Sequence, residues 1–157
     1  MDKFNRTSRL SRLSEKVILY QSDTTVGFSS QDAKKLQKIK SRDPSKAFIK
    51  IFKDLKTLNM LGLRVPYKYK NTLRRSKKSS FVVKNIAFRV VNNPINSQTL
   101  RDIPWHYSTS ANESGKNFNL DFCEEKADII IQNKDGLREL NSSSLYKLNH
   151  TKRKKIR

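Results

Sequence analysis

Short apolar runs separated by polar turns recur along the chain and predict several strands. The run Val17-Ile18-Leu19-Tyr20 is short and continuous, which is typical of a buried strand. Residues 81–83 and 86–91 are apolar-rich and flank the pair Lys84-Asn85, a combination that predicts a hairpin with a tight turn. A further strand is expected at 128–131.

Apolar residues at helical spacing predict two helices in the first third of the chain. A stripe from Ala33 to Ile39 predicts a helix that ends near Lys40, and Ser29 and Asp32 have the spacing of a capping box before it. The pair Asp43-Pro44 is expected to open a second helix. The apolar stripe predicted for that helix consists of Phe48, Ile51, Phe52, Leu55 and Leu58.

The remaining segments mix expected loops, helices and strands. Residues 64–80 are basic and poor in apolar residues, so a loop or arm is expected there, and residues 141–144 read as a polar loop. Helices are expected at 93–100, where Asn93-Pro94 would form the cap, and at 121–126. Because strands and helices do not alternate strictly, the pattern predicts an α/β or α+β fold with a mixed sheet.

A length of 157 residues fits one domain with a real core. We expect that domain to span residues 1–150 and the basic tail at 151–157 to be disordered. The single cysteine, Cys123, excludes an internal disulfide, and with only two histidines a metal site is not expected. No apolar run approaches the roughly 20 residues of a membrane span, so a cytoplasmic protein without membrane contact is expected.

The charge is strongly positive and unevenly distributed. Lys and Arg number 34 against 14 Asp and Glu, a formal net charge of +20, and no acidic residue occurs from Leu55 to Arg101. Such clustering favours contact with a polyanion, whether RNA, DNA, a nucleoside phosphate or an anionic membrane, over a merely solvated basic surface. The RNA-binding candidates in the acid-free stretch are Arg74, Arg75, Lys77 and Lys78.

The segment 108–115 is unusually rich in hydroxyl groups and follows a short apolar run that begins at Pro104. A strand that ends in such a loop presents neutral donors and acceptors, which suits an oxygen-rich ligand such as an amino acid or a nucleotide. The alternative is a surface turn, because Ser, Asn and Gly favour turns for local reasons. Segments elsewhere in the chain favour the ligand site.

Three separated segments form one pattern, and they are Tyr20-Gln21-Ser22-Asp23-Thr24-Thr25-Val26-Gly27, Lys40-Ser41-Arg42 and Ser110-Ala111-Asn112. This pattern resembles the signature motifs of the YrdC-like family, the L-threonylcarbamoyladenylate synthases. The first segment resembles the family's Tyr-Pro-Thr-Asp/Glu-Thr-Val-Tyr-Gly. Lys40-Ser41-Arg42 is similar to its Lys-x-Arg, and Ser110-Ala111-Asn112 to its Ser-x-Asn. Weaker matches are Ala87-Phe88-Arg89-Val90 and the pair Ser143-Ser144. Order and approximate spacing agree over residues 15–148.

The resemblance implies a twisted mixed sheet with flanking helices and a concave basic surface. It also implies a nucleotidyltransferase that condenses L-threonine, bicarbonate and ATP into threonylcarbamoyl-AMP and pyrophosphate. In the family the product serves the threonylcarbamoyl modification of adenosine-37 in tRNA, through a transfer complex, and some members bind double-stranded RNA. Mg²⁺ is expected to arrive with ATP, through the phosphates.

The resemblance also implies roles for individual residues. Lys40 and Arg42 would act as the catalytic cations that clamp phosphates or carboxylates. Ser22 and Thr24 would hold threonine. The residues implied in nucleotide binding are Ser80, Arg89, Ser110, Asn112, Ser143 and Ser144.

One of several departures from the family pattern lies before the central hairpin. The family carries Pro-Gly-Pro-x-Thr before the central hairpin, whereas this chain has Ser76-Lys77-Lys78-Ser79-Ser80, with Ser80 in the place of the threonine. Loss of both prolines and of the glycine replaces a rigid loop with a cationic one. Two functions therefore compete: the synthase, and a non-catalytic protein of the same fold that binds tRNA or double-stranded RNA.

Overall fold

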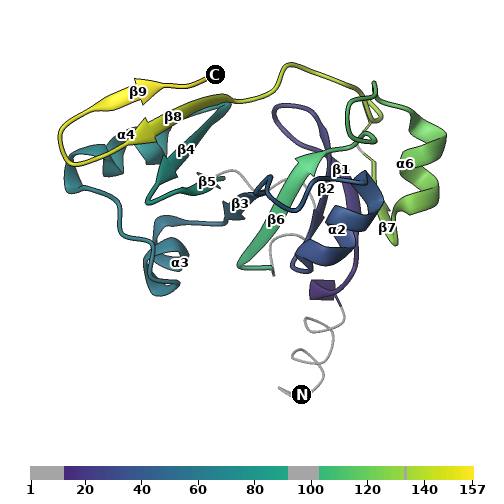
Figure 1. Cartoon of the computed structure of the whole chain (residues 1–157), viewed down its shortest axis with the longest axis horizontal. Coiled ribbons are helices and arrows are strands. Elements are labelled where there is room, and N and C mark those ends of the chain that lie inside the picture. The colour runs from purple at the N-terminus through teal and green to yellow at the C-terminus, as the bar shows by residue number, and fades with distance from the viewer. Residues whose placement is uncertain (1–12, 92–102, 133) are drawn as a thin grey trace, which may run out of the picture.

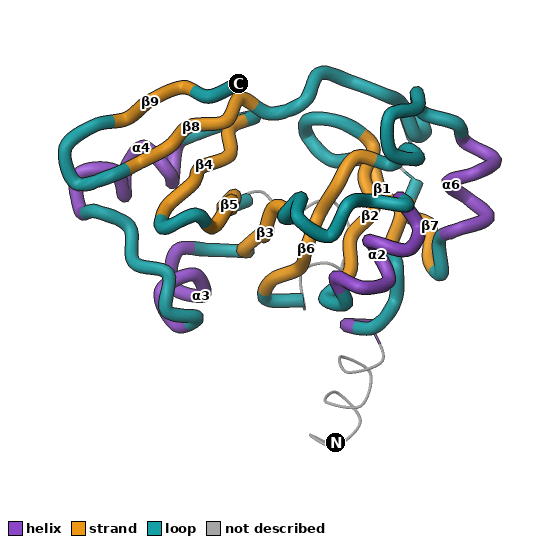
Figure 2. Tube along the Cα trace, viewed as in Figure 1, coloured by secondary structure: helices purple, strands orange, loops and turns teal. Residues whose placement is uncertain are grey.

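The computed structural model describes residues 13–91, 103–132 and 134–157. In these ranges nine strands form one mixed sheet in the order β7-β1-β2-β6-β3-β5-β4-β8-β9, with helices packed along it (Figures 1 and 2). This architecture confirms the α/β prediction. No helix in the described ranges is long and apolar enough to cross a membrane.

The half of the sheet drawn on the right in Figure 1 carries the N-terminal strands. It contains β1 (Ile18–Gln21), β2 (Val26–Ser30), β6 (Trp105–Ser110) and β7 (Ile129–Ile131), together with α2 (Ala33–Lys40) and α6 (Leu120–Lys126). β1 pairs parallel with β7, and β2 pairs antiparallel with both β1 and β6. The core of this half is built around Val17, Leu19, Val26, Phe28, Leu36 and Cys123.

The other half contains the strands from the middle and the end of the chain. These are β3 (Ile49–Phe52), β4 (Ser79–Val83), β5 (Ile86–Val90), β8 (Ser144–Leu148) and β9 (Arg153–Lys155). The helices α3 (Leu55–Met60), η1 (Tyr67–Tyr69) and α4 (Lys70–Arg75) belong to this half. Its core includes Phe52, Leu58, Leu73, Phe81, Phe88 and Leu148.

The predicted hairpin and first helix are confirmed in their extent. Lys84 and Asn85 both have positive φ, 48° and 61°, as the two-residue turn between β4 and β5 requires. α2 ends at Lys40. Its cap differs from the predicted capping box, because Asp32 is itself the N-cap and its carboxylate accepts from Lys34 N and Lys35 N, while Ser29 lies in β2.

The helix predicted from Asp43 through Leu58 is wrong. Asp43 begins only a turn, in which its carboxylate accepts from Ser45 N at 2.8 Å. Ile49–Phe52 is strand β3, inserted between β5 and β6, and Asp54 then caps the short helix α3. Pairing on both sides with neighbouring strands stabilises an extended backbone at residues whose spacing also suits a helix.

Two segments expected to be irregular are ordered by packing. In the predicted basic arm at 64–80, Tyr69 and Leu73 are buried, and their spacing of four residues places them on one face of η1 and α4. The tail at 151–157 is not disordered, because β9 pairs antiparallel with β8. Ser144, expected in a loop, begins β8. The helix predicted at 93–100 lies outside the described residues.

Candidate active site

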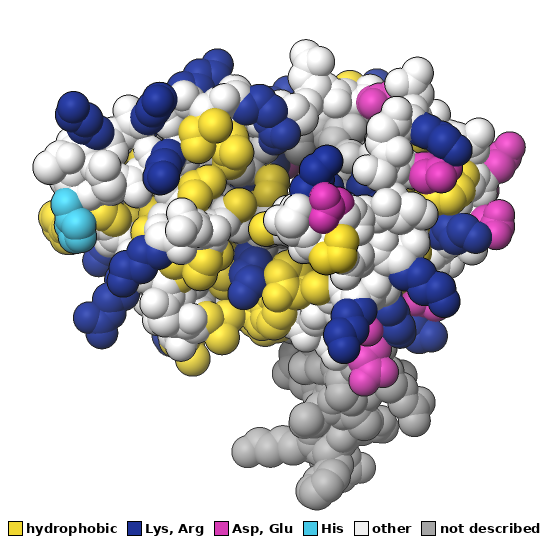
Figure 3. All heavy atoms as spheres, viewed as in Figure 1, with side chains coloured by type: hydrophobic (Ala, Val, Ile, Leu, Met, Phe, Trp, Pro, Cys, Tyr) yellow, Lys and Arg dark blue, Asp and Glu magenta, His cyan; other side chains and the backbone are white. Residues whose placement is uncertain are grey.

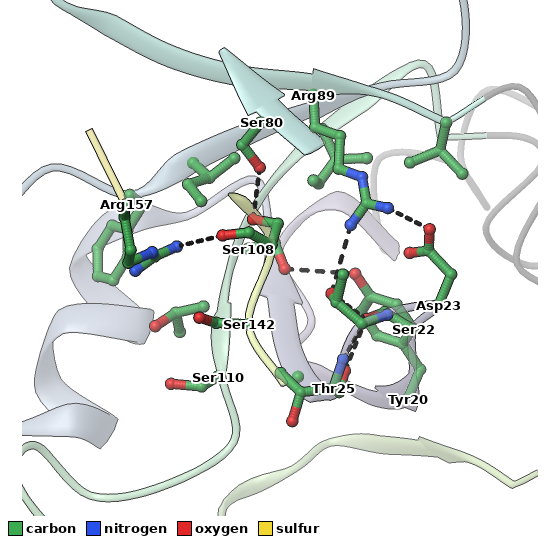
Figure 4. Close-up of a pocket in the computed structure, with 18 of the residues that line it drawn as sticks. Tyr20, Ser22, Asp23, Thr25, Ser80, Arg89, Ser108, Ser110, Ser142 and Arg157 are labelled. Atoms are coloured by element: carbon green, nitrogen blue, oxygen red, sulfur yellow. Dashed lines mark hydrogen bonds and ion pairs between the residues drawn. The ribbon is translucent and has the colours of Figure 1, made fainter. Parts of the chain in front are cut away.

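A cavity of about 190 Å³ lies where the two halves of the sheet meet (Figure 4). Its polar lining consists mainly of hydroxyl groups and of three guanidinium groups, those of Arg42, Arg89 and Arg157. Asp23 is the single carboxylate among the described residues that line it. The serine and threonine residues of the lining are Ser22, Thr24, Thr25, Ser80, Ser108, Thr109, Ser110, Ser142 and Ser143.

The loop between β1 and β2 forms one wall and is shaped by Ser22. The Ser22 hydroxyl accepts from the N–H groups of Thr24 and Thr25 at 3.1 and 3.0 Å, and it donates to the carbonyl of Thr25 at 2.6 Å. These bonds close a tight turn, which Ser favours. The Ser22 hydroxyl is thus occupied within the loop, whereas the Thr24 side chain contacts both Ser22 and a residue across the cavity.

That residue is Arg89, which is only 6% exposed and comes from β5. Its Nη2 forms an ion pair with Oδ2 of Asp23, and its Nη1 donates to Oγ1 of Thr24 at 3.3 Å. Figure 4 shows the Arg89 and Asp23 side chains pointing toward one another across the cavity. A buried guanidinium requires such a partner, and here the pairing joins the two halves of the sheet.

The opposite wall joins β4, the segment before β8 and Arg157, the last residue of the sequence. The hydroxyls of Ser80 and Ser143 lie 2.8 Å apart, and both residues are buried. Arg157 donates from Nη2 to the carbonyl of Ser143 at 3.2 Å and lines the cavity. Sequence reasoning missed Arg157 because the tail was expected to be disordered, and its position depends on the pairing of β9 with β8.

Lys40 does not line the cavity but fixes the loop that follows β6. Its side chain is buried, and Nζ donates to the carbonyls of Ser110 and Asn112 and to Oδ1 of Asn112, each at 2.8 Å. Burial, followed by the nearby charge of Arg42, lowers the pKa of Lys40 to about 8. The structure thus brings Lys40, Ser110 and Asn112 together, and of these three only Ser110 reaches the cavity.

Arg42 lines the cavity from the segment between α2 and β3. Its Nε donates to the carbonyl of Lys46 and its Nη2 to the carbonyl of Ala47, both at 3.1 Å. The guanidinium also lies over the ring of Phe48, 5.1 Å from the centroid. These contacts hold the group in place at the cavity wall, where a fixed cation can neutralise an anionic ligand.

Position 27, beside the site, requires a residue without a side chain. A Cβ built on Gly27 would lie 2.9 Å from the backbone oxygen of Thr109 in the neighbouring strand. Gly27 and Thr109 belong to paired strands, so neither backbone can move aside easily. Close packing of β2 against β6 thus sets the position of Ser108 and Ser110 at the cavity.

Besides Lys40 and Asn112, five of the predicted residues lie away from the cavity lining. Ser144 pairs with Ser79 in the sheet. Arg74 and Arg75 end α4, and Lys77 and Lys78 follow in the turn before β4. Sequence reasoning also missed Asp23 as the partner of Arg89, and Tyr20, whose hydroxyl lies 3.3 Å from Oγ of Ser108.

No protein-family model matches the chain, and no curated protein matches its sequence. Its fold, in contrast, matches solved structures. Sua5 from P. abyssi, complexed with L-threonine, superposes with a TM-score of 0.74 at 16% sequence identity, over 100% of this chain and 54% of that one. YciO from E. coli gives a TM-score of 0.72 at 17% identity, over 99% and 89%.

A third match is full-length HypF in its phosphate- and nucleotide-bound form, with a TM-score of 0.68 at 17% identity, over 97% of this chain and 28% of that one. This chain therefore spans little more than half the length of the Sua5 protein and about a quarter of HypF. Such low identities show the fold and leave the activity open. The chain has the YrdC-like fold.

Proposed function

We propose that the cavity condenses L-threonine, bicarbonate and ATP into threonylcarbamoyl-AMP, with release of pyrophosphate. The observation that carries this proposal is the approach of Arg42, Arg89 and Arg157 to one small cavity whose remaining polar lining consists mainly of hydroxyls. Guanidinium groups match phosphates and carboxylates, and hydroxyls match the neutral polar atoms of an amino acid. Support comes from the shared fold with a Sua5 complexed with L-threonine and a HypF that binds phosphate and nucleotide.

The proposed reaction has two bond-forming steps. The α-amino nitrogen of threonine attacks the carbon of bicarbonate, water leaves, and a carbamate forms. A carbamate oxygen then attacks the α-phosphorus of ATP, and pyrophosphate departs with the electron pair of the broken P–O bond. Both steps concentrate negative charge on oxygen atoms, so substrate positioning and fixed cations are sufficient means of catalysis.

The contacts suggest a separate role for each of the charged residues of the site. Arg42 and Arg157 are the cations proposed for the phosphates, and Arg89 orients Thr24, whose hydroxyl is proposed to contact threonine. Lys40 acts through the loop that it holds, as a positioning residue for Ser110 and Asn112.

Mg²⁺ is proposed to arrive with ATP. In the described residues no cluster of three or more His, Cys, Asp or Glu could hold a metal ion, and Asp23 is paired with Arg89. Phosphate oxygens are therefore the proposed ligands, and the metal would neutralise their charge when bound.

The test measures pyrophosphate release with ATP, threonine and bicarbonate. Release should require all three substrates, and Arg42→Ala should lower kcat/KM by at least about 100-fold, as expected for loss of a fixed cation at a developing charge. Lys34→Ala removes an exposed lysine of α2 and should leave the rate unchanged. Absence of threonine-dependent release from the folded protein would argue against the proposal.

A second candidate function, RNA binding, is favoured by the distribution of charge. The ranges 55–91 and 140–157 contain no Asp or Glu, and they supply β4, β5, β8 and β9 to the same half of the sheet. The part of the molecule built from these two ranges includes Arg74, Arg75, Lys77 and Lys78. We propose that tRNA or double-stranded RNA contacts it through phosphates, which would bring the adenylate product near its tRNA target and the complex that transfers it.

This second function predicts RNA affinity that falls steeply with salt. Replacing Arg74, Arg75, Lys77 and Lys78 together by Gln should make the log–log salt dependence shallower by up to about 3.6, if each contacts one phosphate of a duplex. An unchanged slope would exclude this surface as the RNA-binding site.

A further inference from the structure

A second groove lies on the opposite face of the sheet from the candidate active site. Ile49 and Ile51 of β3 line the cavity, whereas Lys50 between them lines this groove, because successive strand residues point to opposite faces. The groove has a volume of about 310 Å³. Its sides are Ala33 and Gln37 of α2, Asn85 of the β4–β5 turn and Ile86 of β5.

Two aromatic rings, those of Phe48 and Tyr107, line the groove, and Trp105 lies beside Tyr107. The rings of Phe48 and Tyr107 are 6.3 Å apart, and Tyr107 meets the ring of Trp105 edge-on at 5.3 Å. All three residues are partly exposed, and Ile86 beside them is 39% exposed. Figure 3 shows the same feature as hydrophobic side chains gathered over β3, β5 and β6, the part of the sheet between α2 and α3. A partly open aromatic surface of this kind suits a planar ligand.

Positive charge accompanies these rings. The ammonium group of Lys50 lies 5.4 Å from the ring centroids of both Trp105 and Tyr107. Lys46 also lines the groove, and no carboxylate is among the described residues that do so. Rings and cations without a compensating acid are complementary to a ligand that carries both a flat base and a phosphate.

We propose that this groove binds single-stranded RNA. An unstacked base lies against Phe48 and Tyr107, and the adjacent phosphates contact Lys46 and Lys50. A single strand fits better than a duplex, because paired bases are stacked inside an A-form helix and cannot reach a recessed ring. The groove shares Ala47 and Phe48 with the lining of the cavity, but its Lys46, Lys50 and Tyr107 do not line the cavity. It does not include the Arg74–Lys78 surface, and the proposal does not rest on the synthase reaction.

Trp105 provides a direct test, because it is the single tryptophan of the sequence and lies beside Tyr107 and Lys50. Titration with a single-stranded RNA octamer should change Trp105 fluorescence in a saturable way, and a blunt RNA duplex at equal phosphate concentration should not. Lys46→Ala with Lys50→Ala should weaken octamer binding about tenfold and make its log–log salt dependence shallower by about 1.4, the value for two phosphates of a single strand.

Tyr107→Leu removes one ring and should weaken octamer binding at least about fivefold, as expected for the loss of one stacked base. Lys34→Ala with Lys38→Ala removes the same number of exposed charges from α2 outside the groove and should change neither binding nor fluorescence. Melting curves exclude variants that fail to fold, and the paired lysine variant provides the test if Tyr107→Leu is unstable.

Three results would overturn the proposal. The first is octamer binding without a change in Trp105 fluorescence. The second is equal weakening by the control pair, which would show that only overall charge matters. The third is equal binding of the duplex with the same sensitivity to Lys46 and Lys50, which would mean that the groove contacts a phosphate backbone without a base.

Discussion

Nζ of Lys40 lies 2.8 Å from Oδ1 of Asn112, although 72 positions separate the two residues in the chain. The same ammonium group donates to the carbonyls of Ser110 and Asn112. One buried side chain thus orders the loop between β6 and α6 and, through Ser110, one wall of the candidate active site. Removing Lys40 should therefore affect stability as well as activity.

Lys40→Ala should lower the free energy of unfolding by about 2–3 kcal/mol, because several partly buried acceptors lose their donor at once. Urea denaturation monitored by circular dichroism measures this change. Lys38→Ala, an exposed lysine two residues earlier on α2, serves as the matched control and should be nearly neutral. Equal stability of the two variants would show that the Lys40 contacts do not hold the loop.

The ion pair between Arg89 and Asp23 should be strongly coupled. Asp23→Asn leaves the buried Arg89 without a countercharge and should destabilise the protein by about 1–3 kcal/mol. Arg89→Met removes the buried charge that Asp23 compensates. The double variant Asp23→Asn with Arg89→Met should therefore lose less free energy of unfolding than the sum of the losses in the two single variants. A double-mutant cycle in urea measures the coupling, and strict additivity would contradict the pairing.

His106 should make the fold sensitive to mild acid. It is 5% exposed, neither ring nitrogen has a hydrogen-bond partner among the described residues, and burial lowers its pKa to about 4. An unfolded histidine has a pKa of about 6.5, so between pH 6.5 and 4 the unfolded state binds more protons than the folded one. Stability should then fall as the pH drops through that window, by up to about 3 kcal/mol.

His106→Phe should remove that part of the acid sensitivity, since the ring remains packed edge-on against Tyr20 without a titrating group. His150→Gln, at the exposed histidine, should keep the wild-type profile. The test is the free energy of unfolding measured from pH 7 to 4.5. Identical pH profiles for His106→Phe and wild type would show that His106 is not the source of the acid sensitivity.

Gly27→Ala should destabilise the junction of β2 and β6. The new Cβ would meet the backbone oxygen of Thr109 at 2.9 Å, and relief of that contact requires a shift of paired strands. A loss of about 1–3 kcal/mol is expected, in the range of other overpacked sites. Thermal and urea unfolding measure it, and a neutral effect would mean that the strands can separate locally.

The strongly patterned segments of the fold could be predicted from the sequence, while the segments shaped by distant pairing could not. The turn at Lys84-Asn85 and the helix end at Lys40 depend on local chemistry, and the structure confirms both. β3 and β9 depend on partner strands that lie far away in the chain. Apolar spacing therefore suggested a helix through 49–52, and composition suggested a disordered tail.

The candidate site shows the same division. The hydroxyl loops and Arg89 could be identified from motifs, and several of these residues line one cavity. Arg157 and the Asp23–Arg89 pair could not be identified in this way. The position of Arg157 depends on the pairing of β9 with β8, and the ion pair depends on how the two halves of the sheet are joined. Motif matching also gave Lys40 a direct catalytic role, whereas its four oxygen contacts favour a positioning role.

Product analysis with ¹³C-labelled bicarbonate tests the proposed synthase most directly. Purified protein is incubated with ATP, L-threonine and the labelled bicarbonate. The nucleotides are then separated, and their masses are measured by mass spectrometry. The expected product is threonylcarbamoyl-AMP that carries one ¹³C atom, formed with an equal amount of pyrophosphate and absent with Arg42→Ala. ATP that stays intact with folded wild-type protein, or pyrophosphate released without labelled product, would contradict the proposed synthase.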